Sequence, residues 1–183
     1  VLTSDSGTFT QLDDIIQQTP TNGSIRLNNN YTYSSGERVG TDGIVINKDI
    51  TIDGDGHAID GDNLASIFQI TDNANVVLKN IVFCNARGNN GSAISLSSSE
   101  NVEIINCQFI NNSALNGGAI YIAGSNASIN KSKFKTNNAS QSGGSIFVEG
   151  NGASIPSGAV HGHLWAYKLR WYGSILSCRH LPI

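Results

Sequence analysis

The chain has 183 residues, which is enough for one domain, or for one domain with a tail, and too few for two full domains. Only 14% of the residues are charged, against roughly a quarter in ordinary globular proteins, and many β-branched residues with 20 glycines argue against helical bundles and doubly wound folds. The net charge of -3 gives no electrostatic footprint for nucleic acid, and no apolar run is long enough to predict a membrane span.

Residues 1–22 are predicted to form an N-terminal cap that includes an amphipathic helix over about residues 10–18. Thr10 and Asp13 have the spacing of a capping box, and Pro20 is expected to end the helix. The apolar face of this helix is predicted to consist of Phe9, Leu12, Ile15 and Ile16. We expect this face to cover the open end of whatever structure follows.

The neighbouring aspartates Asp13 and Asp14 invite a catalytic interpretation. With Thr10 as the cap they would lie in the first helical turn, where the helix dipole favours negative charge. We therefore interpret them as helix-terminal charge rather than as a catalytic dyad.

An internal repeat of 25–26 residues extends from residue 23 to residue 150. Three similar nine-residue segments begin at Asn75, Asn101 and Asn126, and in each of them apolar side chains alternate up to a final phenylalanine. A Gly-Gly-Ala-Ile motif or a variant of it recurs at shifts of 26, in segments that start at Gly91, Gly117 and Gly143. The alternation changes parity at Asn80 and Asn106, which indicates a corner there.

Short strands at a fixed period without a crossover helix predict an all-β fold, a single-stranded right-handed parallel β-helix of about five coils. This is a solenoid like that of pectate lyases. Equivalent positions of successive coils would lie ~4.8 Å apart, the spacing of paired strands. A β-sandwich is the competing architecture, but it does not explain the fixed period.

The repeat motifs resemble those of a known group of proteins. The segments Gly117-Gly118-Ala119-Ile120, Phe109-Ile110-Asn111-Asn112 and Phe134-Lys135-Thr136-Asn137 look like the GGAI and FxxN repeats of polymorphic outer-membrane proteins. The stretch from Thr8 to Gly61 is similar to the opening of adhesin-like surface proteins of methanogenic archaea. The resemblance covers residues 7–150, although Phe83-Cys84-Asn85-Ala86 keeps the spacing and loses part of the motif.

This resemblance implies a secreted or wall-attached, non-enzymatic β-helix that binds glycans or proteins of a cell surface. Two alternatives stay open: a polysaccharide lyase or glycoside hydrolase on the same scaffold, and a passive structural spacer of the wall. No signal peptide is visible, and a chain that begins with Val1 is compatible with a leader that has been removed or omitted.

Four carboxylates lie within ten residues, and they are the strongest candidates for a metal site: Asp53, Asp55, Asp60 and Asp62. Oxygen ligands at alternate positions suit Ca²⁺, but neither the EF-hand pattern nor the calcium β-roll spacing is present. Asp-Gly pairs are also typical of tight turns, and we favour that interpretation, with no cofactor. His57 is assigned to the phenylalanine column as a partly buried ring.

An inverting hydrolase needs carboxylates that face one cleft roughly 6.5–9.5 Å apart. Glu100 and Glu103 are the only acidic residues between Asp72 and Glu149, and neither has an acidic neighbour one coil away. This pattern favours a protein that is not an enzyme.

Two groups of outward side chains are candidates for ligand contact. Lys131, Lys133 and Lys135 alternate along one strand and suit an acidic sugar, although solvated lysines at an edge are the simpler explanation. Tyr121 and Phe147 share one outward column, where they would either stack on a sugar ring or pack beneath a loop or the tail. We favour packing.

Cysteine and asparagine add two smaller expectations. Cys107 is predicted to be buried and to form no disulfide with Cys84, because the two lie too far apart along the turn. Asn-x-Ser/Thr sequons, which permit glycosylation without proving it, occur at Asn22, Asn30, Asn90, Asn111, Asn126, Asn130 and Asn138.

Residues 151–183 form a tail without the repeat. Residues 1–150 carry 8 basic and 14 acidic residues, whereas the tail carries 3 basic and none acidic, together with both tryptophans. Such a change is typical of an out-of-frame translation. The alternative is a genuine C-terminal cap built from Trp165, Tyr167, Trp171 and Tyr172. Both interpretations predict that the β-helix ends by residue 150 and that no in-register strand follows.

Overall fold

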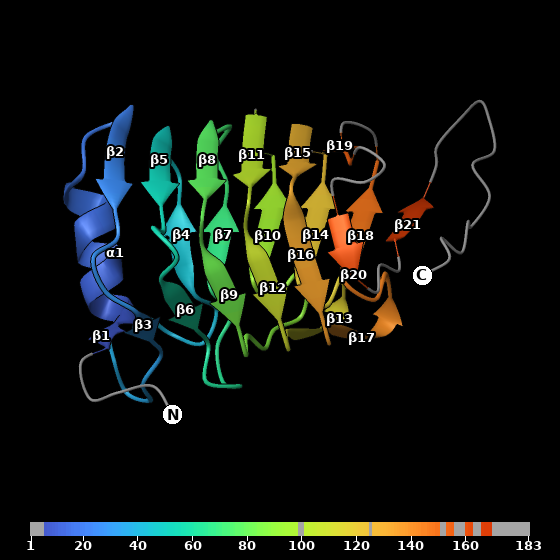
Figure 1. The fold of residues 1–183 in the computed structure, drawn as a ribbon, viewed down its shortest axis with the longest axis horizontal. Helices are drawn as coiled ribbons and strands as arrows, with labels where there is room; N and C mark the ends of the chain where they lie inside the picture. The colour runs from blue at the N-terminus through green and yellow to red at the C-terminus, as the bar shows by residue number, and fades with distance from the viewer. Residues whose placement is uncertain are drawn as a thin grey trace.

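The chain winds into a right-handed parallel β-solenoid whose coils stack along a single axis (Figure 1). The computed structural model describes residues 6–98, 101–124, 126–150 and 153–155, and the backbone of residues 160–162 and 166–169. The β-helix expected from the repeat is confirmed. The described part makes about six coils rather than five, because its three main sheets hold seven, six and six strands.

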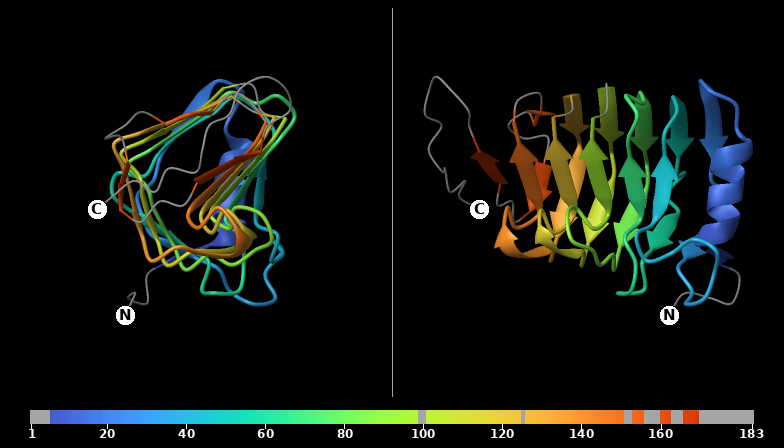
Figure 2. Two further views of the ribbon diagram at one scale, coloured as in Figure 1. Left: turned by 90° about the vertical axis from the view of Figure 1, so that its right-hand side faces the viewer. Right: turned by 180° about the vertical axis from the view of Figure 1, so that it is seen from behind.

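Every strand pairs in parallel with the equivalent strand of the next coil, so the three sheets form three faces around one core (Figure 2). The first sheet consists of β1 (Gly7–Thr8), β3 (Tyr31–Thr32), β6 (Ala58–Asp60), β9 (Val82–Cys84), β12 (Gln108–Ile110), β16 (Ser132–Lys135) and β20 (Val160–Gly162). The second consists of β2 (Gly23–Arg26), β5 (Ile50–Asp53), β8 (Val76–Lys79), β11 (Asn101–Ile105), β15 (Asn126–Asn130) and β19 (Ala153–Ser154). The third consists of β4 (Ile44–Ile46), β7 (Phe68–Ile70), β10 (Ile94–Ser97), β14 (Ile120–Ala123), β18 (Ile146–Glu149) and β21 (Ala166–Leu169). A short sheet pairs β13 (Ser113–Asn116) with β17 (Asn138–Ser142).

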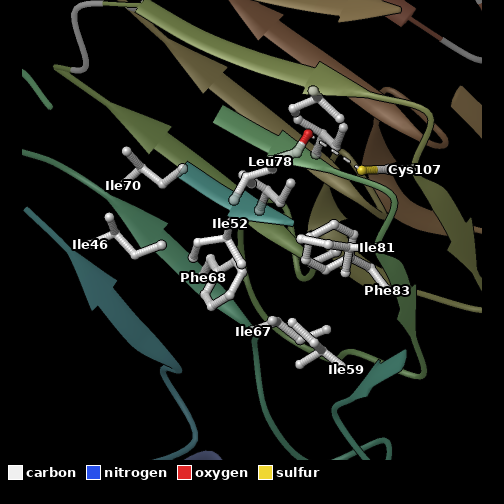
Figure 3. Close-up of a cluster of buried hydrophobic side chains, with 14 of the residues drawn as sticks. Ile46, Ile52, Ile59, Ile67, Phe68, Ile70, Leu78, Ile81, Phe83 and Cys107 are labelled. Atoms are coloured by element: carbon white, nitrogen blue, oxygen red, sulfur yellow. Dashed lines mark hydrogen bonds between the residues drawn. The ribbon is translucent and has the colours of Figure 1, made fainter. Parts of the chain in front are cut away.

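The core is built from columns of like side chains, because register partners in neighbouring coils occupy the same position. Phe109 stacks on Phe83 with ring centroids 5.0 Å apart and on Phe134 with centroids 4.7 Å apart, and all three rings are buried. Phe68 packs against Phe83 in a T-shaped arrangement with ring centroids 5.8 Å apart (Figure 3). Aliphatic columns such as Ile52, Leu78 and Ile104 fill the remainder.

Helix α1 (Phe9–Gln18) lies across the first coil and buries Phe9, Leu12 and Ile16. Its start differs from the prediction. The N-cap is Thr8, which forms a capping box with Gln11: Gln11 N donates to Thr8 Oγ1 at 3.1 Å, and Thr8 N donates to Gln11 Oε1 at 2.9 Å. Thr8 is already held in extended backbone by β1, so the helix begins immediately after it rather than at Thr10.

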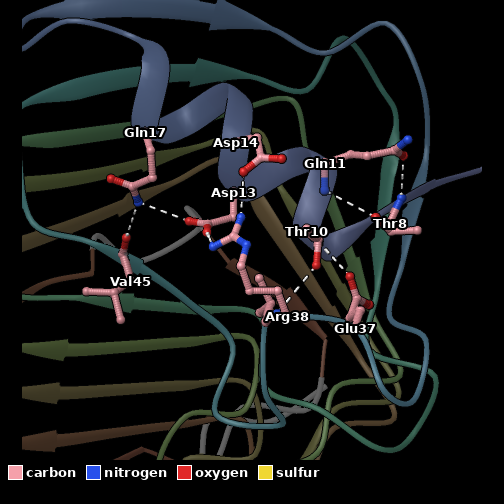
Figure 4. A network of polar contacts seen from close by, with 10 residues as sticks. Thr8, Thr10, Gln11, Asp13, Asp14, Gln17, Glu37, Arg38 and Val45 are labelled. Carbon is pink, nitrogen blue, oxygen red and sulfur yellow. Dashed lines mark hydrogen bonds and ion pairs between the residues drawn. The ribbon is translucent and has the colours of Figure 1, made fainter.

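The two aspartates therefore lie beyond the first turn, and the interpretation of Asp13 and Asp14 as N-terminal helix charge is wrong. Arg38, from the loop after β3, holds both: Nη1 lies 2.7 Å from Asp13 Oδ2, and Nη2 lies 2.5 Å from Asp14 Oδ1 (Figure 4). Glu37 Oε2 accepts a hydrogen bond from Thr10 N at 2.6 Å. Ile15, expected on the apolar face, is 38% exposed.

The solenoid does not end at residue 150 as predicted. In the described part of the tail, β19 pairs with β15, β20 with β16, and β21 with β18, all parallel. Pairing requires only backbone N–H and C=O groups, and the last regular coil presents a row of them, so an extended segment adds to it without the repeat motif. The side chains of Trp165, Tyr167, Trp171 and Tyr172 lie outside the described residues.

The phenylalanine stack gives a test of the core. Phe109→Ala should lower the free energy of unfolding by about 3–5 kcal/mol, because it removes a fully buried ring between two others. Urea unfolding followed by circular dichroism measures the change. Glu103→Ala, at an exposed position of β11, is the control and should change stability by less than about 0.5 kcal/mol. Equal effects of the two substitutions would contradict the stacked core.

Candidate functional site

The corner between the second and first sheets is shaped by residues in left-handed backbone. Asn80, Asn106 and Lys131 occupy equivalent places in successive coils and have φ of 56°, 53° and 52°. Asparagine adopts this conformation more readily than other non-glycine residues, because its short amide bonds to nearby groups. The corner predicted from the parity change at Asn80 and Asn106 is thus confirmed.

The corner asparagines also bond to one another between coils. Asn106 Nδ2 donates to Asn80 Oδ1 at 2.8 Å, and Asn80 Nδ2 donates to Asp53 Oδ1 at 2.9 Å. A second ladder of the same kind runs from Asn111 through Asn85 to Asp60. Each amide donates toward the N-terminal coil, and each ladder ends on a carboxylate, which can only accept when it is ionised.

A shallow, open groove of about 280 Å³ follows the first of these ladders along the solenoid axis. Its lining is mostly polar and comprises Asp55, Gly56, Asn80, Ile81, Val82, Asn106 and Gln108. Gln108 is exposed on β12. The groove is therefore lined by amide side chains from two neighbouring coils.

Asp55 in this lining and Asp53 at the end of the first ladder are both paired with cations. Arg26 Nη2 lies 2.8 Å from Asp55 Oδ2, and Lys79 Nζ lies 3.3 Å from Asp53 Oδ2. The hydrogen bond from Asn80 is the largest cause that lowers the pKa of Asp53, so this carboxylate stays ionised at neutral pH. Both carboxylates are thus largely neutralised by their neighbours.

Of the four aspartates considered as calcium ligands, Asp53 and Asp60 accept hydrogen bonds from the backbone N–H groups of the other two, in two turns. Asp53 Oδ1 accepts from Asp55 N at 3.0 Å, and Asp60 Oδ1 accepts from Asp62 N at 2.8 Å, so both form Asx turns. Among the described residues, no three His, Cys, Asp or Glu side chains come together to hold a metal ion. The turn interpretation is confirmed.

The prediction that His57 belongs to the phenylalanine column is wrong. Ile59, not His57, pairs with Phe83, because the corner from residue 53 to residue 58 is two residues longer than its counterpart in the next coil. His57 is half-buried, and its Nδ1 lies 2.9 Å from the Gly54 carbonyl oxygen. It is a turn residue.

A second groove of about 390 Å³ lies on the outer face of the second sheet. It is lined by Asn22, Gly23, Asp49, Ile50, Thr51, Asn75, Val76, Val77, Asn101 and Glu103. Asp49 Oδ1 accepts a hydrogen bond from Asn75 Nδ2 at 3.2 Å, whereas Glu103 is exposed. The groove therefore carries negative charge and no basic side chain in its lining.

Tyr121 and Phe147 share an outward column of the third sheet, as predicted, and their rings stack with centroids 5.6 Å apart. Phe147 is only 6% exposed, which supports packing over sugar binding. The Gly-Gly loops lie against this column: Gly117 has φ of +57°, and a Cβ there would lie 2.9 Å from Phe147 N. The Tyr121 hydroxyl donates to Glu149, and burial raises the pKa of Tyr121 to about 12.

The three candidate lysines stand together on the first sheet and its corner. Lys133 and Lys135 are exposed on β16, in register with Gln108 and Ile110, and Lys131 lies at the preceding corner. The groove and these lysines are therefore neighbours, a proximity that the repeat pattern alone did not predict. Gln108 and the asparagine ladder were missed because no residue of the groove is unusual by itself; reading the repeat copies in register would have placed them side by side.

Both described cysteines are free thiols. Cys107 is buried as predicted, and burial raises its pKa to about 11 and that of the half-buried Cys84 to about 12. The predicted absence of a disulfide between them agrees with the structure, and neither thiol is a reactive thiolate at neutral pH. Five of the seven sequon asparagines are exposed, namely Asn22, Asn90, Asn111, Asn126 and Asn138, whereas Ser132 of the Asn130 sequon is buried.

Comparison with known proteins adds no relative. No family model, curated protein or solved structure is significantly similar to the chain. Within the described residues, no helix is both long and apolar enough to cross a membrane.

The second ladder gives a test at its C-terminal end. Thr136 follows Asn111 in register and has φ of 54°, an unfavourable conformation for a β-branched residue. Thr136→Asn should raise the free energy of unfolding by about 1 kcal/mol, because asparagine tolerates this φ and extends the ladder. Thr136→Gly removes the steric cost without adding an amide. Chemical unfolding should give the Asn variant a higher free energy of unfolding than the Gly variant. A higher value for the Gly variant would contradict the stabilising role of the ladder.

The carboxylate at the end of the first ladder gives a test in pH. The folded-state pKa of Asp53 is lowered, so its contribution to stability is present above about pH 4 and is lost as the pH falls through the folded pKa. Asp53→Asn should therefore be less stable than wild type at pH 6, with the difference shrinking by pH 3. The exposed Asp72→Asn is the control. A difference for Asp53→Asn that does not depend on pH would refute this assignment.

Proposed function

We propose that the protein is a non-enzymatic, adhesin-like β-solenoid of the cell surface that binds glycans through the groove along the Asn80–Asn106 ladder. The observation that carries the proposal is the lining of this groove. Asn80, Asn106 and Gln108, from two coils, line the same shallow channel. Sugar hydroxyls both donate and accept hydrogen bonds, and amide side chains do the same.

The geometry of the repeat supports a polymeric ligand over a small molecule. The groove is open and follows the solenoid axis, and the equivalent corner amides of Asn80 and Asn106 lie one coil apart, at ~4.8 Å. Enclosed pockets that bury most of a ligand are typical of small-molecule sites. An extended chain of sugars would meet Asn80 in one coil and Asn106 with Gln108 in the next.

A glycan panel tests the proposal. The protein should bind at least one surface polysaccharide saturably, without releasing new reducing ends or unsaturated products. Gln108→Ala should weaken this binding about fivefold, since it removes one exposed hydrogen-bonding group from the groove. Gln18→Ala, at an exposed position of α1, is the matched control and should bind as wild type.

Three results would overturn the proposal. Turnover of a bound polysaccharide would favour the alternative of a lyase or hydrolase. Absence of binding to every glycan would favour a passive spacer. Binding that Gln108→Ala leaves unchanged would place the site elsewhere on the solenoid.

A further inference from the structure

The groove leads directly onto a basic surface. Lys131 follows Asn106 in the corner column, and Lys133 is the register partner of Gln108. Lys135 lies two residues further along the exposed side of β16. Successive outward residues on one strand are separated by roughly 6.6 Å. A ligand that extends by one coil beyond the groove therefore meets up to three ammonium groups.

These lysines have no acidic partner among the described residues. The ion pairs within the described residues involve Arg26, Arg38 and Lys79, and none of them involves Lys131, Lys133 or Lys135. At the opposite end of the groove, Asp55 is paired with Arg26, and Asp53, at the end of the ladder, is paired with Lys79. Among the described residues, the unpaired charge next to the groove is therefore that of the three lysines at its C-terminal end, although the chain as a whole has a net charge of -3.

We propose that the ligand is an acidic polysaccharide, a polyuronate, that lies along the solenoid axis. Its hydroxyls contact Asn80, Asn106 and Gln108, and its carboxylates contact the three lysines. This inference rests on the proposed glycan binding and adds the chemical class of the ligand. The second groove is a poorer site for such a polymer, because Asp49 and Glu103 in its lining would repel carboxylates.

Single-stranded nucleic acid is the other polyanion that the lysines could attract. Proteins that bind it combine basic grooves with aromatic rings on which bases stack. The lining of this groove contains no aromatic residue, and the stacked pair Tyr121 and Phe147 belongs to a different sheet. The amide lining fits hydroxyl groups, so we argue for the polysaccharide.

The test uses alginate and alginate whose carboxyl groups have been reduced to alcohols, so that the two polymers differ chiefly in charge. Isothermal titration calorimetry should show that alginate binds at least about tenfold more tightly, as three exposed ion pairs permit. The triple variant K131Q/K133Q/K135Q should bind alginate only as strongly as the reduced polymer. Raising the salt concentration should weaken alginate binding to wild type and affect the variant little.

Arg87→Gln, which removes an exposed cation outside the groove lining, is the matched control and should bind alginate as wild type. Unchanged melting of the triple variant shows that its fold is intact.

Equal affinity for the two polymers would overturn the polyuronate inference and leave glycan binding standing. Alginate binding that the triple variant retains would also overturn it. If neither polymer binds and the glycan panel is negative, both proposals fail. If single-stranded RNA displaces alginate at equal charge concentration, the contact is one of charge alone and the inference falls.

Discussion

The structure depends on one constraint: each coil pairs in parallel with the next, so a side chain stacks on the residue at the same position one repeat away. For a phenylalanine or an asparagine this arrangement is favourable, as the Phe83–Phe109–Phe134 stack and the Asn80–Asn106 ladder show. For a charge it is unfavourable, because like charges in register repel. This repulsion explains the low fraction of charged residues in the chain. It also fits the positions of Lys131, Lys133 and Lys135, because the equivalent residue in the preceding coil is uncharged in each case.

The period made much of the fold predictable. The β-helix, the buried phenylalanines, Cys107 and the asparagine corners all followed from repeated letters in register. The start of the helix could not be predicted in this way, because Thr10 and Asp13 have the same spacing as the true capping box of Thr8 and Gln11. Only the pairing of β1 distinguishes the two. The tail strands were missed because backbone pairing needs no side-chain motif.

Only the lysines of the candidate site could be predicted from the sequence. Lys131, Lys133 and Lys135 stood out by their charge, whereas Asn80, Asn106 and Gln108 belong to turns and strands of ordinary composition. Only the register of β9, β12 and β16 shows that these amides and the lysines lie next to one another on neighbouring coils. The extra length of the corner after Asp53 could not be read from a fixed period, so His57 was misplaced.

Side-chain amide NMR tests the central claim most directly, because the groove contains three amides whose signals can be followed separately. On titration with alginate, the Nδ2 and Nε2 proton signals of Asn80, Asn106 and Gln108 should shift together and saturate at one ligand concentration. The amides of Asn75 and Asn101 in the second groove should stay unchanged. Shifts confined to the second groove, or to residues around Tyr121 and Phe147, would contradict the account.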